Sequence, residues 1–434
     1  MGFESTVDVG NTGGVAALTS SSRDAYADES VRREVSKQGT ADQLTTTLTG
    51  VNGLFDITGT SGVSASLTQL LNGFSALSVT PDDPSARQNV ITGAQAVASG
   101  FQQLAKSLGA ASSDAETAIR SNVAQVNALA RQIQGYNVER QRSGAGDAGL
   151  EAKLSGALES LSQIANISAS TAPDGTTTVL LAGQTPLVIG SQAFAIQSAL
   201  APAGTVAPAY PGGLPSIVIQ DQAGNDITAQ VTEGKLAGVL QVRNSTLPGI
   251  RGDRSQQGSL NQLAQGFADR VNTLLTSGNI STGPPAVPGV ALFTYAAANP
   301  TGVAASIAVN PSISAAQIAT IDPGPPASSN GIANSVAQIA QGTNPLDQIA
   351  GVGFTAFFGT IAAGVGSQLS LATDNQGLQQ QAVAQAKNLQ SNLSGVSLDG
   401  EAVKLLQYQK SYEALAKLIT VLDQVTQSVI AMVS

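Results

Sequence analysis

Apolar residues recur with a helical period in the first half of the chain. Between Ser113 and Arg140 they are spaced three and four residues apart, which places them on one face of a long helix. A second series with the same spacing follows a Gly-rich joint. Two such helices with a short loop between them predict an antiparallel helical hairpin. The members are Ile119, Val126, Leu129, Ile133 and Tyr136 in the first series, and Leu150, Leu154, Leu158, Leu161 and Ile164 in the second.

The segment before this hairpin, from Ser21 to Leu108, reads as helices broken by Gly-rich joints. The clearest stop is Thr80-Pro81-Asp82-Asp83-Pro84. Proline fixes its own backbone angle and disfavours helix at the residue before it. We therefore expect one helix to end at Thr80 and another to begin near Pro84.

A different pattern follows the hairpin. Short β-branched or apolar runs, separated by Asp-Gly and Gly-Asn-Asp turns, predict strands at 176–181, 186–189, 216–220 and 227–231. Helical spacing returns at 260–274. A stretch rich in Pro, Gly and Ser covers 277–347, and a helix is expected from Phe354 to Leu393.

The last segment has the longest apolar seam. From Leu398 onward, residues three and four apart form a heptad series in which Glu401 and Thr426 are the clearly polar members. A helix of that length measures about 54 Å at about 1.5 Å per residue, more than a small domain can cover. The seam needs another chain or a further helix, so we predict an assembly interface at Leu398, Leu405, Tyr408, Tyr412, Leu415, Ile419, Leu422 and Val429.

Together these patterns predict an α+β protein. Its expected form is an elongated helical rod, with long helices and a coiled-coil-like C-terminal helix, and a small inserted β domain. Five parts are predicted along the chain. They are an extended N-terminal segment (1–20), the first part of the rod (21–167), the β domain (168–232), the second part of the rod with its Pro/Gly-rich stretch (233–393), and the C-terminal assembly helix (394–434).

The amino-acid composition excludes several kinds of functional site. Charged residues make up 11% of the 434 residues and the net charge is -9, without the basic stripe that nucleic acid requires. The chain has no Cys, no His and no Trp, which excludes disulfides, thiolate or imidazole metal ligands, and every nucleophile that depends on Cys or His. The most apolar segment, 414–433, is interrupted by Lys417 and Asp423, so no membrane span is expected.

Two short motifs are better explained as turns. Gly144, Gly146 and Gly149 match the GxGxxG dinucleotide fingerprint, but a helix precedes them where that fingerprint requires a strand. The tripeptide at 251–253 spells Arg-Gly-Asp, which is also ordinary turn chemistry. Neither motif is expected to bind a ligand.

The carboxylates offer no clear catalytic pair. Asp82 and Asp83 lie in the proline turn, and Asp221 and Asp226 bracket a predicted hairpin turn. None of them is flanked by the aromatic or Arg residues of a sugar or phosphate site. We therefore predict no enzyme activity, no catalytic residues, no metal site and no cofactor.

Several segments resemble one known family. The stretch GVSLDGEAVKLLQYQKSYEALAKL, residues 395–418, is similar to the C-terminal signature of the bacterial flagellar hook-associated protein 1 family, also called FlgK. Segments at 70–104, 126–137, 234–249, 260–272 and 289–295 resemble further family segments in the same order. Members of the family begin with a long helix leading into Gly-Tyr. Gly2-Phe3 falls at that point, so the resemblance leads us to expect that the usual N-terminal helix is missing from this sequence. Gly400 stands where the family tends to carry an acidic residue.

The resemblance implies a structural axial protein at the hook-filament junction. It would be exported by the flagellar export apparatus without a cleaved signal and would be extracellular, in the flagellum. Its implied partners are copies of itself, the flagellar hook protein, hook-associated protein 3 and, before export, a chaperone on the C-terminal helix. Another extracellular filament-tip or adhesin-like structural protein is the main alternative, and a hydrolase that uses carboxylates alone is a third.

Overall fold

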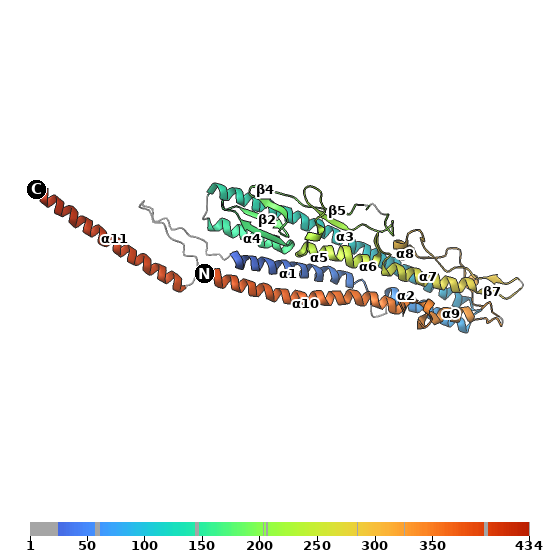
Figure 1. The fold of residues 1–434 in the computed structure, drawn as a ribbon. Coiled ribbons are helices and arrows are strands. Elements are labelled where there is room, and N and C mark those ends of the chain that lie inside the picture. Colours follow the sequence, from blue (N-terminus) through green and yellow to red (C-terminus); the bar gives the residue numbers. More distant parts are fainter. Residues whose placement is uncertain are drawn as a thin grey trace. The chain divides into compact units, whose positions relative to one another are not determined.

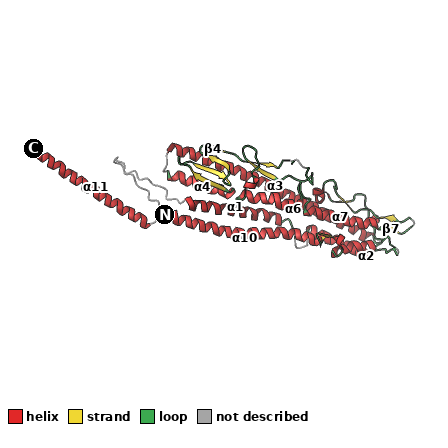
Figure 2. Cartoon of the chain, viewed as in Figure 1, coloured by secondary structure: helices red, strands yellow, loops and turns green. Residues whose placement is uncertain are grey.

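The computed structural model describes residues 25–56, 61–143, 147–202, 204, 207–283, 285–324, 326–394 and 398–433 (Figure 1). The extended segment predicted at 1–20 lies outside these residues. Two compact units divide the chain, one formed by Arg32–Val383 and the other by Met1–Val31 with Ala384–Ser434. The mixture of long helices and small sheets confirms the α+β class (Figure 2).

Four helices come first: α1 (Ala25–Asn52), α2 (Gly62–Val79), α3 (Pro84–Ser143) and α4 (Ala148–Ile164). The predicted stop between Thr80 and Pro84 is confirmed as the turn between α2 and α3. The predicted Gly-rich breaks up to Leu108 are wrong within α3, which is one helix of 60 residues. A Cβ on Gly93 would meet Leu70 Cα at 3.3 Å, and one on Gly100 would meet Ser66 Oγ at 3.3 Å. These glycines therefore permit close packing against α2 instead of ending the helix.

Helices α3 and α4 form the predicted hairpin. Asp147 caps α4 by accepting hydrogen bonds from the backbone N–H groups of Gly149 and Leu150, and Arg140 pairs with Glu151 at 3.0 Å. The two predicted apolar series meet in one buried cluster. It includes Ile119, Val126 and Ile133 from α3, and Leu154, Leu158, Leu161 and Ile164 from α4.

The β region packs on this hairpin. A four-stranded antiparallel sheet in the order β1-β2-β3-β4 consists of β1 (Ile167–Thr171), β2 (Thr177–Leu181), β3 (Thr185–Ile189) and β4 (Gln192–Ala193). A separate pair joins β5 (Gln197–Leu200) to β6 (Ile217–Gln220). Val179, Leu187 and Ile219 belong to the same buried cluster as the helical stripes. The strands thus share the core of the helices that flank them in the sequence.

One predicted strand is wrong. Residues 227–231 form a 3-10 turn, η1 (Thr228–Gln230), and not a strand. Asp226 Oδ1 accepts hydrogen bonds from both the backbone N–H and the hydroxyl of Thr228, which favours a turn there. Ile227 and Val231 are still buried, so the apolar pattern was correct about burial but not about backbone conformation.

Asparagine side chains on the helices hold the strand backbones. Asn137 accepts from Thr177 N at 2.8 Å and donates to Thr177 O at 2.8 Å and to Gly190 O at 2.7 Å. Asn127 makes the same pair of bonds with the N–H and C=O of Ile196, at 2.9 and 2.8 Å. An amide has both a donor and an acceptor, so one side chain can satisfy an unpaired peptide group at a strand end.

We expect Asn137→Ala to lower the free energy of unfolding by about 1–3 kcal/mol or more, because buried peptide groups lose their partners. Urea unfolding followed by circular dichroism measures this. The control Gln134→Ala removes a single exposed bond to Ser191 O and should cost within about 0.5 kcal/mol. Equal losses for the two variants would show that the buried amide does not hold the sheet.

The remainder of the larger unit has shorter elements. The helices are α5 (Lys235–Gln241), a π-helical turn η2 (Val242–Thr246), α6 (Leu247–Arg251), α7 (Ser259–Ser277), α8 (Val303–Ser306) and α9 (Gly331–Gln338). Single 3-10 turns are η3 (Pro300–Gly302), η4 (Ala315–Gln317), η5 (Ile339–Gln341) and η6 (Pro345–Asp347). The strands pair as β7 (Asn279–Ser281) with β8 (Val287–Pro288), β9 (Phe293–Thr294) with β10 (Ala308–Val309), and β11 (Gln348–Ile349) with β12 (Val352–Gly353).

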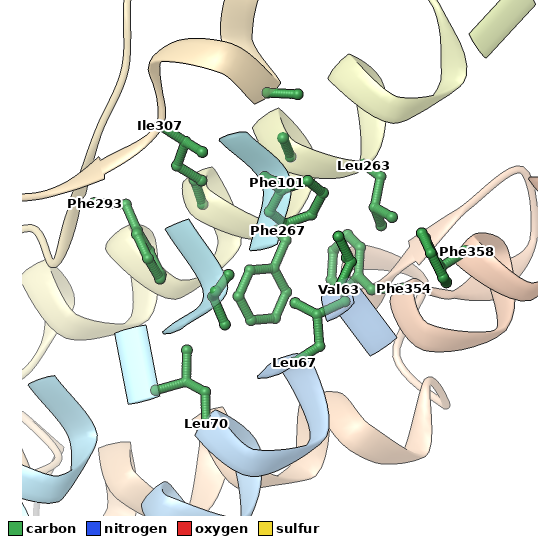
Figure 3. Close-up of a cluster of buried hydrophobic side chains, with 14 of the residues drawn as sticks. Val63, Leu67, Leu70, Phe101, Leu263, Phe267, Phe293, Ile307, Phe354 and Phe358 are labelled. Carbon is green, nitrogen blue, oxygen red and sulfur yellow. The ribbon is translucent and has the colours of Figure 1, made fainter. Parts of the chain in front are cut away.

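A second buried cluster is built around Phe267 of α7 (Figure 3). Its ring lies 6.1 Å from that of Phe293 and 5.6 Å from that of Phe354, the latter edge-on. Leu67 and Leu70 from α2 complete this part of the cluster. Helices α2 and α7 and the start of α10 (Phe354–Ser394) therefore share one core.

Tyr295 adds a pH-sensitive contact at the surface of this unit. Its hydroxyl donates to Asp269 Oδ1 at 2.6 Å, and burial, followed by the Asp269 carboxylate, raises the pKa of Tyr295 to about 12 from 10.0. Because the folded pKa lies above the unfolded one, this stabilisation is complete below about pH 10 and is lost as the pH rises toward 12.

We expect the melting temperature of the Tyr295→Phe variant to fall less than that of the unmodified chain as the pH rises from about 10 to about 12. Melting temperatures measured across that range test the expectation. The two proteins should fall in parallel if Tyr295 titrates normally when folded, which would contradict the prediction.

Helix α10 is, among the described residues, the one helix whose length and composition would suit a membrane span. Its buried face explains part of this apolar character, since Phe354, Phe358, Ile361 and Val365 lie in the core of the larger unit. Core helices of globular proteins satisfy the same criterion.

Candidate assembly interface

The predicted C-terminal helix is present as α11 (Leu398–Val433). The predicted interface residues whose side chains are described are all exposed, by between 55% and 78%: Tyr408, Tyr412, Leu415, Ile419 and Leu422. Leu398, Leu405 and Val429 lie on the same helix, but their side chains fall outside the described part of the structure. Whether this face assembles stays a prediction.

Three charged residues of α11 lie away from the seam, whereas Glu401 belongs to it. At about 100° per residue, Lys410, Glu413 and Lys417 fall on the face opposite Tyr408. Exposed Leu418 and Val425 widen the apolar arc beside the seam. An exposed apolar arc of this size is the kind of surface that contacts another molecule or another segment, in line with the predicted interface.

A second exposed apolar stripe lies on α10 and was not predicted. Leu371 is 66% exposed and Leu378 is 62% exposed, and they are seven residues apart on one side of the helix. A signal was present in the sequence, because Asp374 is the single charged residue between Phe354 and Ala386. Exposed helix faces of soluble proteins normally carry several charges.

An uncharged groove of about 460 Å³ opens beside the start of this stripe. One wall is α10, and the other is formed by η2 and α6 together with Gln241 at the end of α5 and Ser259 at the start of α7. Ile250, Phe357 and Ile361 give it an apolar lining, while Ser245, Thr360 and Gln368 supply hydroxyl and amide groups. The groove can take an apolar or amphipathic group but has no fixed charge to hold an ion.

The Arg-Gly-Asp tripeptide is part of a rigid turn. Asp253 Oδ1 accepts from the N–H groups of Ser255 and Gln256, and burial lowers the pKa of Arg251. Gly252 has φ 87°, where a Cβ would meet Gln257 O at 2.2 Å. These hydrogen bonds and the positive φ of Gly252 are those of an ordinary turn.

The candidate carboxylates bond to their own turns. Asp83 accepts from Ser85 N at the start of α3, and the side chain and backbone of Asn225 hold the pKa of Asp221 below its usual value. Within the described ranges, no group of three or more His, Cys, Asp or Glu residues is placed to hold a metal ion. Gly149 belongs to the capped first turn of α4, so it serves the hairpin.

Comparison with known proteins assigns the C-terminal helix to a class. The profile described as the flagellar basal body rod FlgEFG protein C-terminal matches residues 390–432, which contain nearly all of α11. The C-terminal segment is therefore similar to that of flagellar basal body rod proteins.

The particular family follows from the larger unit. The profile described as the flagellar hook-associated protein FlgK helical domain matches residues 48–293, more than half of the 434 residues. The chain belongs to the FlgK family of flagellar hook-associated proteins, a structural family of the flagellum. This confirms the resemblance seen in the sequence.

Individual relatives agree with this assignment. Flagellar hook-associated protein 1 of Salmonella typhimurium is 29% identical over 228 residues, and that of Escherichia coli is 27% identical over 224 residues. The matches cover 50% of this chain but 38% and 39% of those proteins, so the chain spans well under half of their length.

A solved structure shows the same fold. The structure of the flagellar hook junction protein FlgK from Burkholderia pseudomallei matches with a TM-score of 0.68. The match covers 85% of this chain and 100% of that one at 15% sequence identity. At this identity the likeness establishes the fold alone.

Proposed function

We propose that the chain is a structural axial component at the hook-filament junction of the bacterial flagellum, assembling through α11. The observation that carries this proposal is the exposed apolar seam of α11, located in a segment that matches the flagellar rod profile. An apolar seam on an uncovered helix gains free energy mainly when another helix covers it. Family membership favours the flagellar interpretation over the adhesin-like alternative.

The partners are proposed on the same basis. They are copies of this chain, the flagellar hook protein, hook-associated protein 3 and an export chaperone that covers α11 before assembly. The last two follow from the family resemblance. We also propose export through the flagellar export apparatus without a cleaved signal, and an extracellular location in the flagellum.

The domain division is proposed as well. In it the β region at 168–232 is an insert in the rod, and residues 394–434 are the assembly helix. Strands β1 to β6 and helix α11 support these two bounds. We infer that the protein has no enzyme activity, which is supported by its structural family and by carboxylates that bond within turns.

Deletion of the gene in its native host tests the function. Cells without the protein should release flagellin into the medium and lack filaments, and the gene supplied on a plasmid should restore them. Filaments of normal number and attachment after deletion would contradict the proposal. Loss of surface attachment with normal filaments would instead support an adhesin.

A further inference from the structure

A second groove, between α1 and α3, has the size of a small-molecule site. Its volume is about 460 Å³, and ligand pockets typically measure about 300–1,000 Å³. Helix α1 forms one wall from Gln43 to Leu54, and α3 forms the other from Ser107 to Ala118. All of these residues belong to the larger unit, so this α1–α3 groove is a feature of that unit alone.

The floor of the α1–α3 groove is apolar. Val51 and Ala115 line it, are 1% and 2% exposed, and each belongs to one of the two buried clusters. Leu54 and Ala118 are half-buried and pack against the same two clusters. A ligand in the groove can remove the remaining exposed apolar surface of these residues from water, which favours binding.

Two hydroxyl groups that line the groove can act only as acceptors toward a ligand. Thr46 and Thr47 donate their hydroxyl protons to the carbonyl oxygens of Asp42 and Gln43, each at 2.8 Å. A hydroxyl has one proton, so each of these oxygens has only lone pairs left to offer. They therefore favour a ligand that brings hydrogen-bond donors.

Asp114 gives the groove a negative charge. It is exposed, and of the described residues that line the groove it alone is charged. No residue in the described part of the chain donates a hydrogen bond to its carboxylate or forms an ion pair with it. The nearest basic residues in the sequence of α3, Lys106 and Arg120, do not line the groove. The carboxylate is thus uncompensated, in a chain whose net charge is -9.

We propose that the α1–α3 groove binds a small organic cation, with its apolar body on the floor and an ammonium or guanidinium head at Asp114. The two parts of such a ligand match the apolar floor and the acceptor groups beside it. A neutral ligand would leave the carboxylate unpaired, and an anion would be repelled by it. This site goes beyond the proposed axial function, and its absence would leave that function untouched.

Three ligands that share a phenethyl body test the proposal on the purified full chain. At neutral pH phenethylammonium is a cation, phenethyl alcohol is uncharged and hydrocinnamate is an anion. In isothermal titration calorimetry at low salt, the cation should bind at least about threefold more tightly than the alcohol, since an exposed ion pair contributes modestly. Hydrocinnamate should bind more weakly than either.

Replacement of the carboxylate tests the role of its charge. Asp114→Asn keeps the size of the side chain and should lower the affinity for phenethylammonium to that for phenethyl alcohol. The affinity for the alcohol should not change. The matched control is Asp374→Asn, which removes an exposed carboxylate from the long helix α10, outside the groove. This control should bind the cation like the unmodified chain.

Filling the groove tests the role of its space. Gly50→Leu should weaken binding of the cation and of the alcohol at least about tenfold, because the new side chain occupies the place of the apolar body. Its melting temperature should not fall, since a Cβ at Gly50 meets no atom within 4 Å. The control is Gly109→Leu on α3, where a Cβ also meets nothing within 4 Å but the residue does not line the groove. It should bind both ligands normally.

Several results would overturn the proposal. They are binding of none of the three ligands, binding of the alcohol or of hydrocinnamate as tightly as the cation, and equal affinity of Asp114→Asn and Asp374→Asn for the cation. Unchanged binding by Gly50→Leu would also overturn it. If Gly50→Leu lowers the melting temperature, the comparison of Asp114→Asn with Asp374→Asn decides.

Discussion

Cells that carry Leu415→Asp together with Leu422→Asp should secrete flagellin and retain no filaments. Both leucines lie on the exposed seam of α11, and burying each is worth about 1.5–3 kcal/mol on assembly. The two carboxylates would instead place unpaired charges in the interface, at several kcal/mol for each. Circular dichroism of the purified variant should show an unchanged helical signal from the larger unit, because neither residue lies in its core.

The control for this variant is Gln424→Glu. Gln424 is exposed and lies about 160° from Tyr408 around the helix, so it is off the seam. One negative charge there should leave filament number and swimming unchanged. If the double aspartate variant also swims normally, α11 is not the element through which the protein assembles.

Phe267→Ala should lower the free energy of unfolding by about 3–5 kcal/mol. Phe267 is fully buried between the rings of Phe293 and Phe354, so truncation leaves a cavity that two other elements line. Part of the effect is the loss of the edge-on aromatic contact, which adds about 0.5–1.5 kcal/mol to area burial. Chemical denaturation with a two-state fit gives the value.

Phe267→Leu is the matched control because it keeps most of the apolar volume. It should cost clearly less than Phe267→Ala. Equal and small losses, below about 1 kcal/mol, would show that this part of the core collapses without penalty and that the aromatic cluster does not hold α7 to α10.

Helices with one buried face could be predicted from the sequence because burial imposes the spacing that periodicity detects. The stripes on α3 and α4 are examples. Glycine was the main source of error in predicting the helices of the first half of the chain. A glycine can end a helix, but it can also lie inside a continuous helix where a neighbouring helix packs closely against it. Only the position of α2 decides that Gly93 and Gly100 belong to a continuous helix.

The β region was partly predictable for a similar reason. Strands β2, β3 and β6 are β-branched or apolar and were expected, whereas β1 and β5 contain Ser and Ala and carried little signal. Their positions depend on pairing and on amides such as Asn127, which bonds to Ile196 69 residues away. No local pattern encodes a bond of that separation.

For the candidate site, the sequence predicted α11 but not the groove. The seam is a local heptad pattern, whereas the groove needs η2 and α6 to lie beside α10, about 110 residues later in the chain. The exposed Leu371 and Leu378 were concealed because α10 has a second, buried apolar face. When burial is unknown, a helix with one buried and one exposed apolar face looks the same in the sequence as a helix that is hydrophobic all round.

The most direct test of the central claim is immunogold electron microscopy of flagella from the native host, with an epitope tag on the full-length protein. If the protein is an axial component of the hook-filament junction, the label should form one narrow band where the hook meets the filament. The Leu415→Asp, Leu422→Asp variant should give no band. A label spread over the cell surface or along the filament, or none on purified flagella that carry filaments, would contradict the account.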